Sequence, residues 1–192
     1  MDDRGSRPGG RSAVVRRKVL DAVLSCLDEG LVKSSIPDIA ARAGVAPSSI
    51  YRRWETRENL VAEALLTESD ESIPVPDTGA IRSDLIGFAE GLAAFLASRR
   101  GTAILRAMMM IEWSEELSEL RARFWDQRFA ASSVMIQRGI DRGELAPGTD
   151  ARLFLQMLIA PLHLRHLLLG GDPATAIAEQ VDLLLAGAGR TP

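Results

Sequence analysis

A short segment near the N-terminus carries several side chains that can form hydrogen bonds. It reads PSSIYRRWETR from Pro47 to Arg57 and combines hydroxyl, phenol and guanidinium groups. An arginine can form two parallel hydrogen bonds with the edge of a guanine base, and a serine can donate or accept one. Arg52 is therefore a candidate for reading a base, and Ser48 and Ser49 are candidates for contacts beside it. Side chains of these types are suited to binding a polar, anionic surface.

Two short helices joined by a tight turn are expected to position these side chains. The preceding stretch, SIPDIAARAG, offers Ser35 as a helix cap, with Asp38 three residues later in a variant of the capping box. Gly44 is expected to end that helix, and Pro47 to open the next one in its preferred first turn. The apolar residues predicted to pack the two helices together are Ile36, Ile39, Ala40, Ile50 and Trp54. The lengths and the turn predict a helix-turn-helix motif at about residues 35–54, whose second helix can enter a major groove.

Other polar groups near this motif are suited to phosphates, which position a protein on DNA without reading its sequence. Tyr51, Arg53 and Arg57 are the side chains expected to do so. The start of the first short helix, at Ser34 and Ser35, is expected to offer unpaired N–H groups to another phosphate. The complete predicted DNA surface is Ser34, Ser35, Pro47, Ser48, Ser49, Tyr51, Arg52, Arg53 and Arg57. A solvated basic helix at an ordinary helix corner is the alternative, and the coincidence of turn, cap and inward apolar pair argues against it.

Charge is distributed unevenly along the chain. The formal net charge is −3, but residues 1–60 carry eleven Lys and Arg against eight Asp and Glu. Residues 61–192 carry twelve against eighteen. A basic front on an acidic body indicates that only the N-terminal part faces an anionic partner.

Three features bear on the compartment in which the protein works. Cys26 is the only cysteine, which excludes an internal disulfide and favours a reducing compartment. The first ten residues lack the apolar core of a signal peptide. The longest apolar stretch, residues 153–169, is interrupted by glutamine, proline, arginine and histidine, which a membrane-spanning helix tolerates poorly. We therefore expect a cytoplasmic protein with no membrane partner.

The rest of the sequence is predicted to be helical, because apolar residues recur at spacings of three and four. The expected fold class is all-α, with about nine helices. Residues 1–10, rich in Gly, Arg, Pro and Asp, are predicted to be a flexible arm. Residues 11–60 form the predicted helix-turn-helix domain of three helices, and residues 61–192 form a second, larger helical domain. In that second domain, Asp172 is expected to cap a last helix that Gly187 stops.

Residues 35–65, SIPDIAARAGVAPSSIYRRWETRENLVAEAL, resemble the N-terminal DNA-binding domain of TetR-type (TetR/AcrR) transcriptional regulators. The residues that carry the resemblance are Ile39, Ala40, Ala43, Gly44, Val45, Ala46, Tyr51, Trp54 and Arg57. The chain departs from the family pattern at three of them: Ala46 replaces a capping serine, Trp54 a phenylalanine and Arg57 a lysine. More loosely, RGEL at residues 142–145 and VDLLLAG at residues 181–187 are similar to one subgroup of the family's C-terminal domains.

The resemblance implies a ligand-responsive repressor that a small, largely apolar inducer releases from a palindromic DNA operator. It also implies that the second domain binds the ligand and forms a homodimer through the last two helices. The sequence supports the dimer independently, because residues 150–169 are apolar nearly all round. Leu153 and Leu164 lie on one side of this helix, and Leu155 and Leu162 on another. A two-fold dimer would place two recognition helices one turn of DNA apart.

The resemblance places the inducer inside the second domain, where methionine side chains can adapt to varied apolar ligands. The candidate lining residues are Phe88, Leu92, Met108, Met109, Trp113, Phe124, Arg128, Met157 and His163. For each of them, ordinary helix packing is the alternative role. A metal site at His163 and His166, which share a helix face, lacks a third ligand nearby, so neither a metal nor another cofactor is expected.

Other functions remain open from the sequence. An activator could use the same fold, and operator binding with and without cell extract would separate it from a repressor. A helical small-molecule carrier would need a degraded recognition helix, whereas this chain keeps Tyr51, Arg52 and Arg57. An enzyme is not expected, because the sequence has no glycine-rich phosphate loop, no convincing Ser-His-Asp set and no Cys-His pair.

Overall fold

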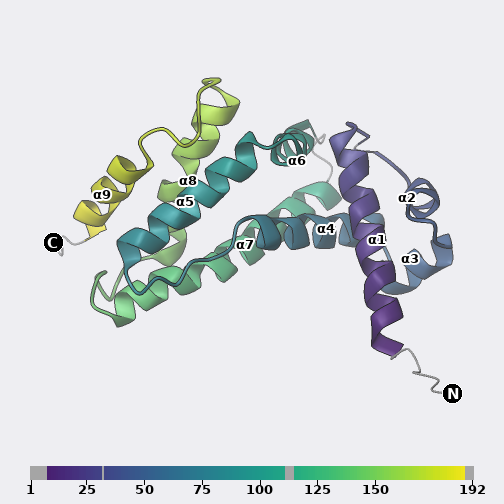
Figure 1. Ribbon diagram of the computed structural model, residues 1–192, viewed down its shortest axis with the longest axis horizontal. Coiled ribbons are helices and arrows are strands. Elements are labelled where there is room, and N and C mark those ends of the chain that lie inside the picture. Colours follow the sequence, from purple (N-terminus) through teal and green to yellow (C-terminus); the bar gives the residue numbers. More distant parts are fainter. Residues whose placement is uncertain (1–7, 32, 111–114, 189–192) are drawn as a thin grey trace, which may run out of the picture.

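All regular secondary structure in the described part of the chain is helical. The computed structural model describes residues 8–31, 33–110 and 115–188, and these ranges contain nine helices (Figure 1). The helices are α1 (Pro8–Asp28), α2 (Ile36–Ala43), α3 (Pro47–Trp54), α4 (Arg57–Ser72), α5 (Ile81–Ala97), α6 (Arg99–Met110), α7 (Glu115–Asp141), α8 (Ala151–Leu167) and α9 (Ile177–Ala188). The predicted all-α class with about nine helices is confirmed.

Local signals in the sequence set the ends of the short helices α2 and α3. The Ser35 side chain accepts a hydrogen bond from the Asp38 N–H, and the Asp38 carboxylate accepts one from the Ser35 N–H, which completes the predicted capping box. Gly44 ends α2 in the left-handed conformation, with a φ of 66° that glycine adopts without a steric penalty. Pro47 opens α3, and Ala46 before it supplies no side-chain cap. Helix α2 therefore begins and ends where the sequence predicts, and α3 begins where it predicts.

Helices α1 to α4 share one hydrophobic core. Ile50 and Trp54 of α3 are 0% and 4% exposed, and they lie in one cluster with the three apolar α2 residues predicted as their partners. Helix α1 contacts both α2 and α4 and contributes buried Cys26 to the same cluster. The predicted inward packing of α3 is confirmed, and it leaves the opposite face of that helix to the solvent.

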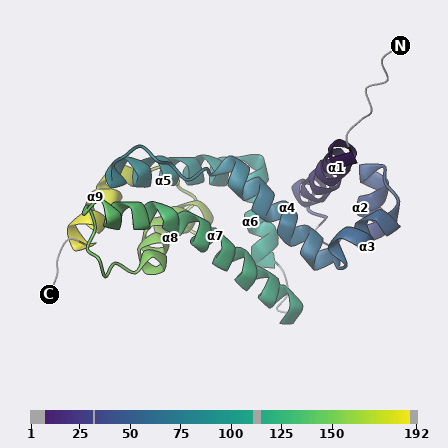
Figure 2. The same ribbon diagram turned by 90° about the horizontal axis from the view of Figure 1, so that it is seen from below.

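The later helices build a second core at the other end of the molecule (Figures 1 and 2). Its buried side chains come mainly from α5, α7, α8 and α9, with Leu85, Met135 and Val181 fully buried. Helix α6 contacts both α1 and α5, and it places Ile104 in the first core and Leu105 in the second. The two halves of the molecule are therefore packed against each other through α6.

Helix α4 also connects the two halves. Leu60 and Ala64 in its first turns are fully buried in the first core, while the helix as a whole contacts α7 and α5 in the body. Arg100 of α6 forms ion pairs with Glu68 of α4 at 3.3 Å and with Asp28 of α1 at 3.1 Å. Helix α4 is therefore packed against both cores.

Helix α8 has two apolar faces, as the sequence predicts. Leu155 and Leu162 are 1% and 0% exposed in the second core, whereas Leu153 and Leu164 are 53% and 47% exposed. Even this helix is not a candidate membrane span, and no helix in the described ranges is long and apolar enough to be one. The outer face of α8 thus remains an apolar surface of the single chain.

The first helix begins earlier than predicted. Residues 1–7 lie outside the described residues. Helix α1 begins at Pro8, so residues 8–10 belong to a helix and the prediction of an arm is wrong for them. A proline is compatible with the first turn of a helix, because the N–H that it lacks would have no partner there.

The ends of the last helix also differ from the prediction. Asp172 accepts a hydrogen bond from the Ala174 N–H, but it does not cap a helix directly, because residues 173–176 form a turn. Ala176 in this turn has a positive φ of 57°, and α9 begins only after it. The helix also continues through Gly187, so that residue does not stop it.

Candidate nucleic-acid interface and ligand cavity

Helix α3 presents a polar face that is free to bind a partner. Ser48 and Arg52 are exposed, and Tyr51 is 49% exposed. None of these three side chains forms a hydrogen bond or ion pair with any residue that the structure describes. Their backbone is fixed nonetheless, because Ile50 and Trp54 anchor the other side of the helix. The arrangement combines a rigid support with uncommitted hydrogen-bonding groups.

Arg53 and Arg57 differ from Arg52 because each is already engaged within the chain. The Arg53 guanidinium lies 5.4 Å from the centroid of the Trp54 ring, and its Nη1 donates to the Ser12 hydroxyl at 3.3 Å. Arg57 Nε donates to the Ser34 carbonyl at 2.7 Å. Arg57 Nη1 also lies 3.7 Å from the Glu58 carboxylate. A guanidinium has five N–H donors, so the exposed Arg53 retains donors for a phosphate at the edge of the α3 face.

The prediction that Ser34 and Ser35 offer unpaired N–H groups to a phosphate is wrong. The Ser34 N–H donates to the Leu31 carbonyl at 3.2 Å, and the Ser35 N–H donates to the Asp38 carboxylate at 2.9 Å. Neither N–H is therefore unpaired. The hydrogen bond from the Ser35 side chain lowers the pKa of Asp38, which keeps a negative charge at this helix start and opposes a phosphate there.

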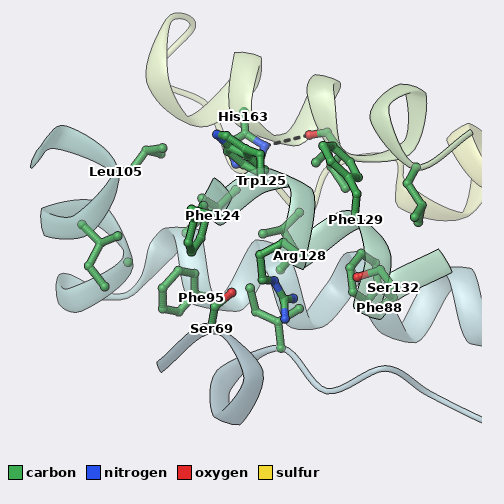
Figure 3. Close-up of a pocket in the computed structure, with 17 residues that line it drawn as sticks. Ser69, Phe88, Phe95, Leu105, Phe124, Trp125, Arg128, Phe129, Ser132 and His163 are labelled. Atoms are coloured by element: carbon green, nitrogen blue, oxygen red, sulfur yellow. Dashed lines mark hydrogen bonds between the residues drawn. The ribbon is translucent and has the colours of Figure 1, made fainter. Parts of the chain in front are cut away.

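A cavity lies inside the body, between α4, α5, α6, α7 and α8. Its volume is about 60 Å³, which is enough for a few water molecules or a small planar group. Its wall consists of Ser69, Ile73, Phe88, Leu92, Phe95, Leu96, Gly101, Ile104, Leu105, Phe124, Trp125, Arg128, Phe129, Ser132, Leu155, Ile159 and His163. Figure 3 shows aromatic rings on several sides of this space, with the Arg128 guanidinium directed towards the α4 side of the cavity.

Five of the predicted lining residues surround this cavity: Phe88, Leu92, Phe124, Arg128 and His163. The predicted side chains of Met108, Met109 and Trp113 lie outside the described residues. Met157 does not line the cavity, and that prediction is wrong, because this residue lies on the outer face of α8 with 54% of its surface exposed. Whether the five residues bind a ligand stays a prediction.

The sequence reasoning missed several lining residues on α7. Trp125, Phe129 and Ser132 line the cavity together with the predicted Phe124 and Arg128. Spacings of three and four residues place Arg128, Phe129 and Ser132 on one side of a helix, so extending the pattern around Arg128 could have found them. Lining residues on other helices, such as α4, carry no comparable signal in the sequence.

One wall of the cavity is shared with a groove on the outside of the body. Trp125, Phe129, Ile159 and His163 line both spaces, so these side chains form the partition between them. The Trp125 and His163 rings meet edge to face, with centroids 6.0 Å apart. His163 Nδ1 lies 2.9 Å from the Ile159 carbonyl, which makes Nδ1–H the donor and fixes the ring.

Protonation of His163 in this partition is expected to make the stability of the folded state depend on pH. Burial lowers the pKa of His163 below its ordinary value of 6.5, the hydrogen bond with the Ile159 carbonyl opposes this in part, and the nearby His166 lowers the pKa further. As the pH falls through 6.5, the unfolded chain binds a proton at this residue before the folded chain does, so the folded state loses stability. We expect His163→Asn to show a shallower loss of stability than the wild type between about pH 7 and pH 5. Urea denaturation at both pH values measures this, and identical pH slopes for the two proteins would contradict it.

The fold and the α3 face define a class of protein. A proline-opened helix supported from behind by a tight turn and a capped partner helix is the geometry with which helix-turn-helix proteins enter a major groove. The chain is therefore a helix-turn-helix DNA-binding protein.

Comparisons with known proteins identify the family within that class. Residues 21–64 match the family described as bacterial regulatory proteins, tetR family, and residues 75–184 match the one described as tetracyclin repressor-like, C-terminal domain. The HTH-type transcriptional regulator AqdR of Rhodococcus erythropolis is 39% identical over 185 residues, covering 95% of this chain and 89% of that protein. The DNA-binding transcriptional repressor TetR of Mycobacteroides abscessus is 31% identical over 169 residues, covering 85% of this chain and 84% of that protein.

A solved structure shares the arrangement of the helices. The crystal structure of TetR family transcription regulator SCO0332 matches this chain with a TM-score of 0.74 at 22% identity, covering 93% of this chain and 99% of that one. The chain belongs to the TetR family of DNA-binding transcriptional regulators. The family resemblance predicted from residues 35–65 is confirmed.

Proposed function

We propose that this TetR-family protein is a cytoplasmic, ligand-responsive repressor that binds a palindromic operator as a homodimer. The observation that carries the proposal is the α3 face, where exposed Ser48 and Arg52 have no partner among the described residues. A charged side chain held on a rigid helix without an internal partner is suited to an external one. The name of the Mycobacteroides abscessus relative, a repressor, supports repression over activation.

Each residue of the α3 face has a specific role in this proposal. Arg52 forms paired hydrogen bonds with a guanine, and Ser48 and Ser49 contact the neighbouring base edges, since the first turns of the recognition helix lie deepest in the groove. Pro47 sets the direction of that helix. Tyr51 and the remaining donors of Arg53, near the end of α3, contact phosphates, and the positive charge of Arg57, at the start of α4, attracts them. Ser34 and Ser35 are left out, because their N–H groups are paired.

The outer face of α8 supports the homodimer. Leu153, Met157 and Leu164 are 53%, 54% and 47% exposed, and α9 beside it adds Leu183 at 75%. Leu168, just after α8, is 70% exposed. A surface of this kind is unfavourable in water, and a second copy related by a two-fold axis would cover both faces at once.

Helix α4 is the element through which a ligand would act on DNA binding. Asn59 near its start donates to the Trp54 carbonyl at 3.1 Å, which ties α4 to the end of α3. Ser69 near its other end lines the cavity, and Asp70 pairs with Arg128 of α7 at 2.5 Å. A small, largely apolar inducer between α4 and α7 would favour one position of α4, and its effect is limited to its difference in affinity for the two dimer states.

We expect Arg52→Ala to weaken operator binding by about 1–3 kcal/mol and to relax the preference at one base position of each half-site. The loss follows from two hydrogen bonds to a base edge that alanine cannot form. Titration of operator and of random DNA by fluorescence anisotropy measures both effects. Arg82→Ala is the matched control, because Arg82 is an exposed body residue paired with Asp182. An equal loss of affinity for random and operator DNA would show that Arg52 does not read a base.

The function as a whole is tested by selecting bound fragments from a pool of random DNA. We expect two similar half-sites, in inverted orientation, with centres about one or two turns of the duplex apart. Enrichment of no sequence would contradict the proposal. Repression is then separated from activation by a reporter gene placed behind the selected site, in cells with and without the protein.

A further inference from the structure

The cavity contains two hydroxyl groups that lack a partner. Ser69 and Ser132 are 5% and 3% exposed, and both line the cavity. Neither side chain forms a hydrogen bond with any of the residues that the structure describes. Among the described residues, the fully buried side-chain oxygen without a partner is Asp28 Oδ1, so the two serine oxygens keep some accessible surface and can bind a molecule in the cavity. Two such hydroxyls on the wall of one cavity indicate a site for a hydrogen-bonding ligand.

Arg128 places a further donor on the same side of the cavity. It lies one helical turn before Ser132 on α7 and therefore shares its face. Arg128 is 8% exposed, and its one partner among the described residues is Asp70, which follows Ser69 on α4. The serine hydroxyls and the arginine thus form a donor-rich edge between α4 and α7 (Figure 3).

The charge of this edge favours an uncharged ligand. The Arg128 guanidinium is already neutralised by the Asp70 carboxylate at 2.5 Å. A ligand carboxylate would have to compete with the solvent-exposed Asp70 for the Arg128 guanidinium, and its burial against the apolar walls of the cavity would cost its hydration. A carbonyl oxygen accepts hydrogen bonds from hydroxyl and guanidinium donors without that cost.

The rest of the wall is suited to a flat aromatic body. Four of the five phenylalanines in the chain line the cavity, and Trp125 lies among them. The Trp125 ring contacts Phe124 edge to face, with centroids 5.4 Å apart, and Phe129 at 5.8 Å. Aromatic pairs prefer such edge-to-face and offset arrangements, which a planar ligand between these rings would extend.

We propose that the ligand of this cavity is an uncharged, planar aromatic molecule with a hydrogen-bond acceptor such as a carbonyl, which Ser69, Ser132 and Arg128 bind. The inference rests on the proposed ligand control, whose ligand class it defines. It also assigns the position of the acceptor, at the edge between α4 and α7, where the ligand contacts the helix that leads to α3.

Three probes that share a naphthalene ring test the proposal on the full chain. They are 2-acetonaphthone with a neutral acceptor, 2-ethylnaphthalene without a polar group, and 2-naphthoate with a carboxylate. We expect the ketone to bind at least about tenfold more tightly than either of the others, measured by quenching of intrinsic tryptophan fluorescence and by calorimetry. Equal binding of the three, strongest binding of the carboxylate, or binding of none would overturn the proposal.

The double variant Ser69→Ala/Ser132→Ala tests the assigned donors. It should weaken binding of the ketone about tenfold and leave binding of the hydrocarbon unchanged, which also verifies that the cavity is intact. Ser133→Ala is the matched control, because the Ser133 hydroxyl donates to the Phe129 carbonyl at 2.7 Å and does not line the cavity. Unchanged ketone binding in the double variant would overturn the assignment.

Operator binding, measured in the same preparations, separates this inference from the proposed function. If the ketone binds through the serines but leaves operator affinity unchanged, the ligand class stands and the proposed ligand control fails. If the chain binds its selected operator but none of the probes, the ligand class fails and the DNA-binding function stands.

Discussion

Replacing Trp54 with alanine is expected to lower the free energy of unfolding of the DNA-binding helices by about 3–5 kcal/mol. The Trp54 side chain is 4% exposed and lies in the core shared by α1, α2, α3 and α4. Its Nε1–H donates to the Glu63 carboxylate of α4 at 2.7 Å, so the substitution removes both a large buried surface and a contact between α3 and α4. Operator binding should be lost with the fold of this domain.

The variant Trp54→Phe separates packing from the hydrogen bond. It keeps most of the buried surface and lacks the indole N–H, so we expect a loss of only about 1 kcal/mol. Urea denaturation followed by far-UV circular dichroism measures both variants against the wild type. A loss for Trp54→Ala no larger than that for Trp54→Phe would show that the residue does not hold the core as we describe.

Charged substitutions on the outer face of the last helices are expected to convert the proposed dimer into a monomer and to lower operator affinity about 10²- to 10⁴-fold. Leu164→Glu and Leu183→Glu combine two such changes at positions 47% and 75% exposed in the single chain. In the dimer these carboxylates would be buried against their counterparts, which is strongly unfavourable. A monomer loses the second half-site contact, whose contribution arises from the high effective concentration within a dimer.

Two measurements test this prediction. Sedimentation equilibrium reports the oligomeric state, and anisotropy reports operator affinity. Val134→Glu is the matched control, since Val134 is similarly exposed at 47% but lies on α7. If the double variant remained a dimer with unchanged operator affinity, the proposed dimer interface on α8 and α9 would be wrong. A Val134→Glu variant that stays dimeric would exclude a general effect of added charge.

The helix-turn-helix could be predicted from the sequence because its determinants are local. Ser35, Asp38 and Gly44 act on backbone groups within a few residues, so the ends of α2 are set by neighbours along the chain. Ile50 and Trp54 lie one helical turn apart, and their spacing alone defines the inward face of α3. The exposed face that carries Arg52 follows from the same geometry.

Contacts between segments that are distant along the chain could not be predicted from the sequence. Arg57 looked like a free phosphate contact, whereas its Nε reaches the Ser34 carbonyl in a loop 23 residues away. Such pairings depend on how segments meet in three dimensions, which no spacing along the chain encodes.

By itself, the sequence determined the all-α class, the caps of α2, the outward face of α3 and the apolar character of α8, because helical periodicity and capping are short-range properties. Only the tertiary structure decided which apolar side chains line a cavity and which fill a core. It turned Met157 outward and His163 inward on the same helix, and it brought Ser69 of α4 and Ser132 of α7 to one cavity wall. Five helices contribute to that wall, and their relative rotation is set by the packing of the whole body.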